Sequence, residues 1–304
     1  MTSTSGLDVA ARIASARSLL FVPGDRPDRI GKALVSGADA VIIDLEDAVR
    51  PDSKQYARSV LADAGDRAAA AHPLHSPQPL LLVRVNAFGS PDFADDIVVA
   101  LASGVDGVVL PKFVPGREAD EVDAAVCAVE ARLGRTDRIP LIGIVESAAG
   151  LLGLSRSVEL PSRVLRLAFG AADYHADLRI SYRPAGVHTD FAMATLVIAS
   201  AAAGLAEPLD SPYFALDDDE GLAAAARRAR DLGFGGALCI HPKQLDIVNS
   251  EFGVRDAERS WAERVVEAWN APSSAGRGAI RVGDELVDEA MVRRARQILD
   301  LLTG

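Results

Sequence analysis

The feature that most constrains the fold is a regular alternation of short apolar segments with longer segments of helical periodicity. The apolar segments have strand length, and no hairpin-type turn signal joins one to the next. Strands that alternate with helices form parallel sheets, and eight such units over about 225 residues fit a closed (β/α)₈ barrel. The apolar segments span residues 18–23, 40–47, 80–86, 107–112, 140–147, 164–173, 210–214 and 237–241.

An open, doubly wound sheet is the competing α/β fold. It requires a glycine-rich dinucleotide turn after the first strand, whereas this chain has Pro23-Gly24-Asp25-Arg26 there. The seventh segment is the weakest, because Pro212 cannot donate to a sheet ladder. After residue 249 the alternation stops. We therefore predict a TIM barrel over residues 1–249 and a C-terminal helical extension over residues 250–304.

The composition is that of a soluble globular protein, with 49% apolar and 25% charged residues among 304. The net charge of −11 argues against a nucleic acid or an anionic membrane as partner. The longest uncharged run, residues 191–206, is shorter than the roughly 20 residues of a membrane span. The N-terminus lacks the apolar core of a signal peptide, and two distant cysteines suggest reduced thiols. We expect a cytoplasmic protein.

Two carboxylates follow neighbouring strand segments of the predicted barrel. Glu146 ends the fifth apolar segment, and Asp173 follows the sixth. Side chains alternate along a strand, so Ile142, Ile144 and Glu146 share one face. Active sites of such barrels lie at the carboxyl ends of the strands, and two acids there can share a hard cation at about 2.1 Å per oxygen. The alternative is a pair of solvated loop acids.

Other charged residues end neighbouring strands and refine this hypothesis. Asp44 and Glu46 end the second segment, Arg84 lies at the end of the third and Lys112 at the end of the fourth. Together with Glu146 and Asp173, these residues comprise four negative and two positive side chains. One divalent cation would cancel the excess negative charge. Carboxylates without cysteine or paired histidine favour Mg²⁺ or Mn²⁺ over zinc. Lys112 suits an ion pair with Glu46 or Asp44 better than a Schiff base.

Seven motifs, in order along the chain, resemble the citrate lyase beta subunit and its relatives, the malyl-CoA, β-methylmalyl-CoA and citramalyl-CoA lyases. The resemblance extends from Arg17 to about Leu302. The motifs are Arg17–Arg29, Gly37–Val49, Val83–Asn86, Leu110–Lys112, Ile144–Ser147, Phe169–Asp173 and Cys239–Pro242.

This resemblance implies a Mg²⁺-dependent barrel enzyme that cleaves or forms a carbon–carbon bond beside an acyl thioester. Cleavage of a 3-hydroxy-acyl thioester then yields a thioester and a 2-oxo acid. By resemblance, Glu146 and Asp173 bind the metal, and Arg84 binds substrate and stabilises an enolate oxygen. The other substrate contacts that it implies are Asp44, Glu46 and the backbone N–H groups of Gly170, Ala171 and Ala172.

Two further sets of roles come from the resemblance alone. Arg17, Arg26 and Lys32 lie where relatives handle the phosphates of the thioester carrier, which is coenzyme A or an acyl-carrier protein. Asp288 lies in a C-terminal motif whose aspartate reaches from a neighbouring subunit and acts in proton transfer. A homotrimer or a multiple of it is therefore expected.

Some alternatives remain open at this point. The chain could be a citryl-acyl-carrier-protein lyase subunit of a multi-protein complex, or a catalytically silent paralogue that binds a thioester or a 2-oxo acid. Residues 174–188 and 210–216 depart from the family pattern and leave the acyl group open. His175 and His188 are expected at the surface, and His241 is expected to stabilise a turn.

Overall fold

The computed structural model describes residues 6–63, 78–156, 159–271, 278–300 and 302. The chain forms two compact units, Met1–Phe252 and Gly253–Gly304. We take them in turn. The division lies close to residue 249, where the sequence pattern changes.

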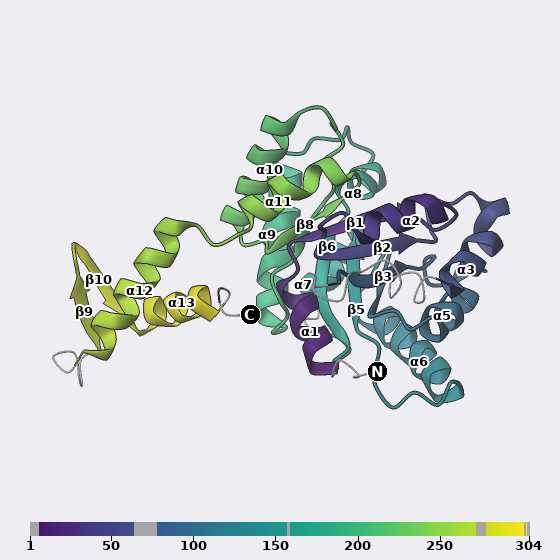
Figure 1. Cartoon of the computed structure of the whole chain (residues 1–304), viewed down its shortest axis with the longest axis horizontal. Helices are drawn as coiled ribbons and strands as arrows, with labels where there is room; N and C mark the ends of the chain where they lie inside the picture. The colour runs from purple at the N-terminus through teal and green to yellow at the C-terminus, as the bar shows by residue number, and fades with distance from the viewer. Residues whose placement is uncertain (1–5, 64–77, 157–158, 272–277, 301, 303–304) are drawn as a thin grey trace. The chain divides into compact units, whose positions relative to one another are not determined.

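The first unit contains a closed barrel of eight parallel strands (Figure 1), so the predicted fold is confirmed. Each strand pairs with the next along the chain, and β8 closes the barrel against β1. The strands are β1 (Ser18–Pro23), β2 (Ala40–Asp44), β3 (Leu80–Arg84), β4 (Gly107–Leu110), β5 (Leu141–Val145), β6 (Val164–Phe169), β7 (Leu209–Asp210) and β8 (Gly236–Cys239).

Helices follow the strands, and local signals set several of their ends. Pro27 occupies the first turn of α2, where its missing N–H costs nothing. Asp218 caps α10 by accepting from the Gly221 N–H, and Gly233 ends that helix in the left-handed conformation. The helices of this unit are α1 (Gly6–Ser15), α2 (Pro27–Leu34), η1 (Pro51–Ser53), α3 (Lys54–Ala62), α5 (Phe93–Ala102), α6 (Arg117–Arg132), α7 (Ala148–Arg156), α8 (Ala171–Asp177), α9 (Val187–Ala202), α10 (Asp219–Leu232), η2 (Pro242–Gln244) and α11 (Leu245–Glu251).

Alternation along the strands fills the barrel interior with apolar side chains and carries polar ones to its mouth. Ile42, Leu82 and Ile144 belong to the interior cluster. Two residues further along the same strands, the same faces carry Asp44, Arg84 and Glu146. The side chains that end β2 and β3 and follow β5 therefore point to the mouth.

Helix α1, which the sequence did not predict, covers the opposite end of the barrel. Ile13 joins the interior cluster. The fully buried Arg166 of β6 donates to the carbonyl oxygens of Ile13, Ala16 and Glu207. Burial lowers the pKa of Arg166 to about 10. These bonds fix α1 beneath the barrel and leave the strands' carboxyl ends as the polar end.

The helical segment between the second and third apolar segments begins at η1 and continues as α3 to Ala62, and residues 64–77 lie outside the described part. Two other elements differ from their predicted form. Strand β7 has two residues, because Pro212 breaks the longer segment that was predicted. Helix α8 begins at Ala171, so the sixth apolar segment, which extends to residue 173 in the sequence, ends as a strand at Phe169.

The second unit contains α12 (Asp256–Asn270), an antiparallel hairpin of β9 (Ala279–Val282) and β10 (Glu285–Asp288), and α13 (Glu289–Asp300). Its small core joins α12, the hairpin and α13 around Val265, Val287 and Val292. The hairpin was not predicted, although Gly283-Asp284 is a recognised turn signal and Gly283 has a φ of 61°. The predicted helical extension is therefore helical with one β-hairpin.

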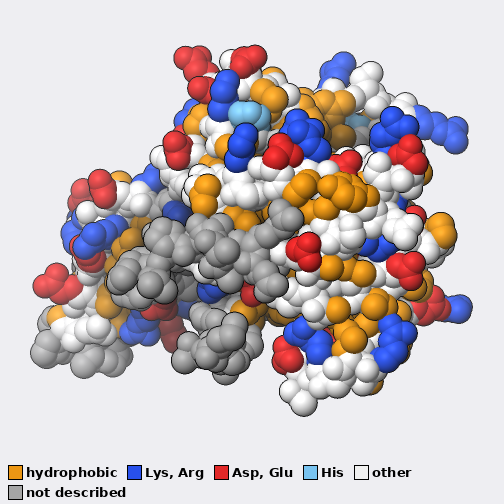
Figure 2. All heavy atoms as spheres, turned by 45° about the vertical axis from the view of Figure 1, so that its right-hand side comes forward, with side chains coloured by type: hydrophobic (Ala, Val, Ile, Leu, Met, Phe, Trp, Pro, Cys, Tyr) orange, Lys and Arg blue, Asp and Glu red, His pale blue; other side chains and the backbone are white. Residues whose placement is uncertain are grey.

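Surface and helix properties bear on possible partners. None of the helices in the described ranges is long and apolar enough to span a membrane. On the face shown in Figure 2, acidic and basic side chains are interspersed among the described residues. This mixture gives no support for a polyanionic partner on that face.

Candidate active site

Arg84 is held at the barrel mouth by two acids. Strand register pairs Asp44 of β2 with Arg84 of β3. Arg84 donates through Nε to Asp44 Oδ1 at 2.8 Å and through Nη2 to Oδ2 at 2.6 Å, a bidentate geometry. Its Nη1 lies 3.1 Å from Glu46 Oε2, and its guanidinium lies 4.7 Å from the centre of the Phe21 ring. Burial alone would lower the pKa of Arg84, but Asp44 and Glu46 raise it, so the side chain stays charged.

Glu46 connects Arg84 to Lys112. Its second oxygen, Oε1, lies 3.2 Å from Lys112 Nζ, which confirms the predicted ion pair. Burial raises the pKa of Glu46, while Arg84 and Lys112 oppose that rise. Asp44 also accepts the backbone N–H groups of Glu46 and Ala48. Asp44 and Glu46 are thus engaged by cations and backbone donors, and both contact Arg84.

Glu146 lies in a confined space at the end of β5. Its side chain is buried, and Oε1 accepts the Lys112 backbone N–H at 2.7 Å. A Cβ at Gly170 would lie 2.4 Å from Glu146 Oε2, so only glycine leaves that oxygen its position. Burial raises the pKa of Glu146 to about 8, and Asp173 and Glu46 add to the effect. Asp173 is exposed in the first turn of α8.

These contacts allow a test of whether the residues fit a divalent cation. Asp44 and Glu46 are neutralised by Arg84 and Lys112, whereas no ion pair to Glu146 or Asp173 occurs within the described ranges. The pair therefore has no cationic partner, and a bound Mg²⁺ ion would favour the ionised form of Glu146 and balance the charge of both carboxylates. No group of three or more His, Cys, Asp or Glu side chains in the described part of the chain could hold a metal alone. Two carboxylates, with water and substrate oxygens, are what Mg²⁺ commonly uses, so the residues fit.

The predicted carboxylate-binding N–H groups are only partly available. The Gly170 N–H donates to the Val145 carbonyl at 3.1 Å, so its predicted role does not hold. The Ala171 N–H donates to Ser211 Oγ at 3.3 Å. This hydroxyl, just after β7, was missed because its segment departs from the family pattern. Ala172 lies exposed in the first turn of α8.

The predicted thioester contacts separate into two groups. Arg26 and Lys32 are exposed at the start of α2 and within it, beyond the carboxyl end of β1. Arg17 instead precedes β1, at the other end of the barrel, where it bonds to Asp39 and to the Asn249 carbonyl. We therefore remove Arg17 from the predicted site, because the length of β1 separates it from the mouth.

Asp288 belongs to the second unit, where it caps α13 through the Met291 N–H.

The two segments that depart from the family pattern lie together. His175 is 2% exposed, so its predicted surface position is wrong. Its Nδ1 bonds to the Ala171 carbonyl and its Nε2 to Thr189 Oγ1. An edge-to-face series of rings runs from His175 through Tyr182 to Phe214.

The other two histidines lie as the sequence predicts. His188 is exposed, and His241 accepts the Lys243 N–H, which confirms its turn-stabilising role.

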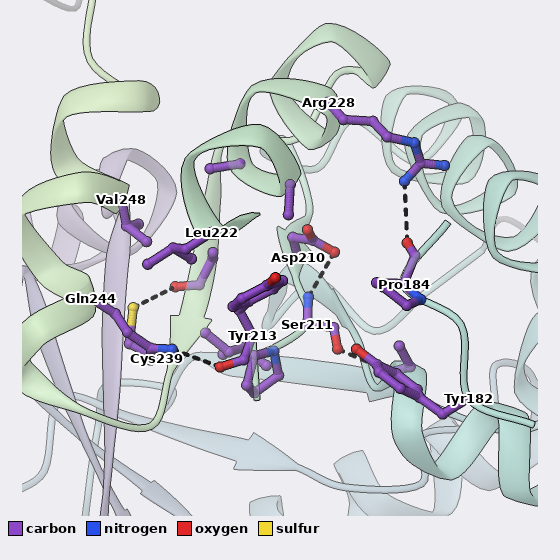
Figure 3. A pocket seen from close by; sticks show the side chains of 16 residues that line it. Tyr182, Pro184, Asp210, Ser211, Tyr213, Leu222, Arg228, Cys239, Gln244 and Val248 are labelled. Carbon is purple, nitrogen blue, oxygen red and sulfur yellow. Dashed lines mark hydrogen bonds between the residues drawn. The ribbon is translucent and has the colours of Figure 1, made fainter. Parts of the chain in front are cut away.

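A separate pocket lies where Tyr182 approaches the segment after β7 (Figure 3). Asp210 Oδ1 accepts the Ser211 N–H at 2.8 Å, and burial raises the pKa of Asp210 to about 7. Most other lining side chains are apolar and come from β8, α10 and α11, including Leu222, Cys239 and Val248. The pocket therefore lies between the sheet and its covering helices.

The fold and the mouth together define a class of barrel enzyme, in which a buried arginine lies beside a carboxylate pair suited to a divalent cation. The comparisons with known proteins place the chain within that class. The sequence profile of the HpcH/HpaI aldolase/citrate lyase family matches residues 17–242, and the chain belongs to this family.

Three relatives illustrate the similarity. A citrate lyase subunit beta-like protein of Deinococcus radiodurans is 38% identical, over 94% of this chain and 97% of that protein. The L-malyl-CoA/beta-methylmalyl-CoA lyase of Rhodobacter capsulatus is 33% identical, over 93% of each chain. The crystal structure of CitE from Mycobacterium tuberculosis, in complex with magnesium, acetoacetate and coenzyme A, superposes with a TM-score of 0.74 at 28% identity, covering 96% of this chain and 100% of that one. The resemblance found in the sequence and the lyase class that it implies are thus confirmed.

Proposed function

We propose that the protein is a Mg²⁺-dependent lyase that cleaves or forms the carbon–carbon bond of a 3-hydroxy-acyl thioester of the citryl, malyl or citramalyl type. The observation that carries this proposal is the division of charge at the mouth. Arg84 and Lys112 neutralise Asp44 and Glu46, and Glu146 and Asp173 are left as a pair of acids. The magnesium and coenzyme A bound to the M. tuberculosis relative support the assignment.

Glu146 and Asp173 are the residues that would hold the Mg²⁺ ion. When bound, the ion supplies Lewis-acid polarisation to the hydroxyl (or oxo) and carboxylate oxygens of the substrate. The Lys112 N–H fixes Oε1 of Glu146, and the space above Gly170 keeps Oε2 free of steric contact. Glu146 is thereby oriented before any ligand arrives.

Arg84 supplies a preorganised charge for the thioester oxygen. Retro-Claisen cleavage leaves the electrons of the broken bond on the thioester fragment as an enolate. A donor aimed at that developing charge contributes roughly 3–4 kcal/mol to transition-state stabilisation. Asp44 and Glu46 hold the guanidinium in place through three of its nitrogens, so little reorganisation is required during the reaction.

Proton transfer and carrier binding complete the proposed mechanism. A carboxylate must deliver a proton to the enolate carbon when cleavage is complete, and we assign this role to Asp288 of a neighbouring subunit. The enzyme would then be a homotrimer or a multiple of it. As a separate part of the proposal, we assign the enzyme to the cytoplasm. Arg26 and Lys32 provide exposed positive charge for the carrier's phosphates, and the malyl-CoA lyase relative favours coenzyme A over a carrier protein.

The test is a screen of malyl-CoA, citramalyl-CoA and citryl-CoA as substrates of the wild-type protein. Each substrate is assayed in the presence of Mg²⁺, and again after an excess of chelator is added. We expect formation of a 2-oxo acid that stops when the chelator is added. The Glu146→Gln variant should lose turnover and metal binding together, because the amide no longer supplies a charged ligand. Mg²⁺-dependent turnover that survives in Glu146→Gln would reject the assigned site.

A carrier-protein complex is the second candidate function. The similarity to a citrate lyase subunit beta-like protein favours it. Purification of the native protein from its own cells separates the two candidates, since a stable complex with an acyl-carrier protein and a transferase would replace the free-standing enzyme. The intact set of Arg84, Glu146 and Asp173 argues against a silent paralogue, whose signature would be thioester binding without turnover.

A further inference from the structure

Lys112 lies between Glu146 and the Arg84 cluster, and it contacts a residue of each part of the site. Its backbone is unusual. Its φ is 51°, and Arg179 is the only other non-glycine residue of the described chain with a positive φ. This left-handed conformation is unfavourable for residues that have a Cβ. It is retained only where the surrounding contacts hold the backbone in place. Strand β4 ends at Leu110, so the unusual conformation falls just past the strand, at the barrel mouth.

Two neighbouring contacts hold this conformation. The Phe113 N–H donates to the Ile144 carbonyl at 2.9 Å, so the chain rejoins β5 directly after Lys112. The Phe113 ring packs so closely against Gly143 that a Cβ there would lie 2.6 Å from Phe113 Cγ. Between the strand and this anchor, Lys112 directs its own N–H away from the strand ladder and to Glu146 Oε1, at 2.7 Å.

The side chain of Lys112 reaches the other half of the site. Its Nζ lies 3.2 Å from Glu46 Oε1, and the second oxygen of Glu46 lies 3.1 Å from Arg84 Nη1. A continuous series of polar contacts therefore runs from Glu146 through the backbone and side chain of Lys112 to Glu46 and Arg84. The ammonium is half-exposed, whereas Glu46 is buried. Lys112 is thus the outermost member of the series.

We propose that Lys112 is a positioning residue that sets the metal ligand and the arginine relative to each other. Its backbone N–H orients Glu146 for the cation, and its ammonium, through Glu46, orients Arg84 for the developing enolate. This inference rests on the proposed function, since both oriented groups take their roles from it. The two parts of Lys112 act on different steps, so they are separable by substitution.

Three variants separate the backbone from the side chain. Lys112→Gly removes the ammonium but accepts a positive φ without strain. Lys112→Val also removes the ammonium, and its branched Cβ opposes the left-handed conformation. Lys112→Arg keeps the charge. Arg179→Val is the matched control, because it places the same branched side chain at the other left-handed position.

The first readout is Mn²⁺ binding, followed by electron paramagnetic resonance without substrate. We expect Lys112→Gly to bind Mn²⁺ at least as tightly as the wild type, because the N–H donor remains and a positive charge has left. Lys112→Val should lose roughly 10- to 100-fold in affinity, the usual effect of removing a contact that orients a metal ligand. Arg179→Val should bind normally. If Lys112→Val does not fold, Lys112→Ala replaces it in the comparison. Alanine also has a Cβ that opposes a positive φ, but it lacks the branching of valine.

The second readout is steady-state turnover of the thioester substrate with saturating Mg²⁺. Lys112→Gly should lose roughly 10- to 100-fold in kcat with little change in KM, and Lys112→Arg should restore most of the loss. Equal Mn²⁺ affinity in Lys112→Gly and Lys112→Val would overturn the backbone role. Wild-type kcat in Lys112→Gly would overturn the side-chain role.

The failure of this inference is distinguishable from the failure of the proposed function. A wild-type protein that binds Mn²⁺ but cleaves no thioester would reject the lyase proposal and the side-chain role, while the Mn²⁺ comparison would still decide the backbone role. A wild-type protein that binds no Mn²⁺ would overturn the inference together with the metal site.

Discussion

Gly170→Ala gives a sharp test of the confined space around Glu146. Gly170 has a φ of −104°, which alanine adopts freely, so any effect must come from the added methyl group. That methyl carbon would lie 2.4 Å from Glu146 Oε2, 2.5 Å from Glu146 Cβ and 3.1 Å from Ile144 Cγ2. Non-bonded carbons pack best at about 3.5–4.0 Å. Glu146 must therefore move.

The expected magnitudes follow from these overlaps. Overpacking a well-filled site costs about 1–3 kcal/mol of unfolding free energy. Displacement of Glu146 also breaks its bond from the Lys112 N–H, so divalent cation affinity should fall by roughly 10- to 100-fold. Gly31→Ala is the matched control, because a Cβ at Gly31 of α2 meets nothing within 4 Å. It should raise stability by about 0.5–1 kcal/mol, the usual gain for alanine in a helix.

The assay combines urea denaturation of both variants with Mn²⁺ titration. Gly170→Ala should be the less stable protein and the weaker cation binder, and Gly31→Ala should bind Mn²⁺ like the wild type. Wild-type Mn²⁺ affinity in a folded Gly170→Ala protein would refute the reasoning, since it would mean that the position of Glu146 does not matter for the cation.

Three further predictions concern the surroundings of the site. Asp210→Asn should flatten the pH dependence of stability between about pH 4 and 7, because the raised pKa of Asp210 makes the wild type lose stability as pH rises through that window; denaturation midpoints across this range provide the check. Lys54→Met should cost about 1.5–3 kcal/mol per charged hydrogen bond lost, since its ammonium bonds to two carbonyls and to Asn86 Oδ1; urea denaturation measures it, and a change near zero would contradict this expectation. A double-mutant cycle of Tyr182→Ala and Phe214→Ala should give a coupling energy of about 0.5–1.5 kcal/mol, because the rings meet edge to face at 5.7 Å; additive effects would show that the segments are independent.

Periodicity alone predicts much of the barrel mouth. Because the strand period is two, Asp44, Arg84 and Glu146 could be placed on inward faces from sequence, and the structure has them there. The error over Arg17 was avoidable by the same reasoning. Arg17 precedes its strand, so strand direction alone assigns it to the opposite end of the barrel, whatever motif it belongs to.

Other features of the site depend on tertiary contacts that leave no local signal. The left-handed backbone of Lys112 accompanies the packing of Phe113, in the loop after β4, on Gly143 of β5. The burial of His175 depends on Thr189, which a loop brings back across α8. Neither the periodicity nor the composition of residues 174–188 distinguishes a buried imidazole from an exposed one.

Arg166 has a consequence for how this protein is handled in the laboratory. The residues before β1 contribute no strand to the barrel, yet the carbonyls of Ile13 and Ala16 accept hydrogen bonds from the Arg166 guanidinium. A shortened protein that begins at Arg17 would keep this buried cation and lose two of its acceptors, at a cost of about 1–3 kcal/mol or more for a charged group. Affinity tags and deletions at the N-terminus should therefore leave the segment from Gly6 onward intact.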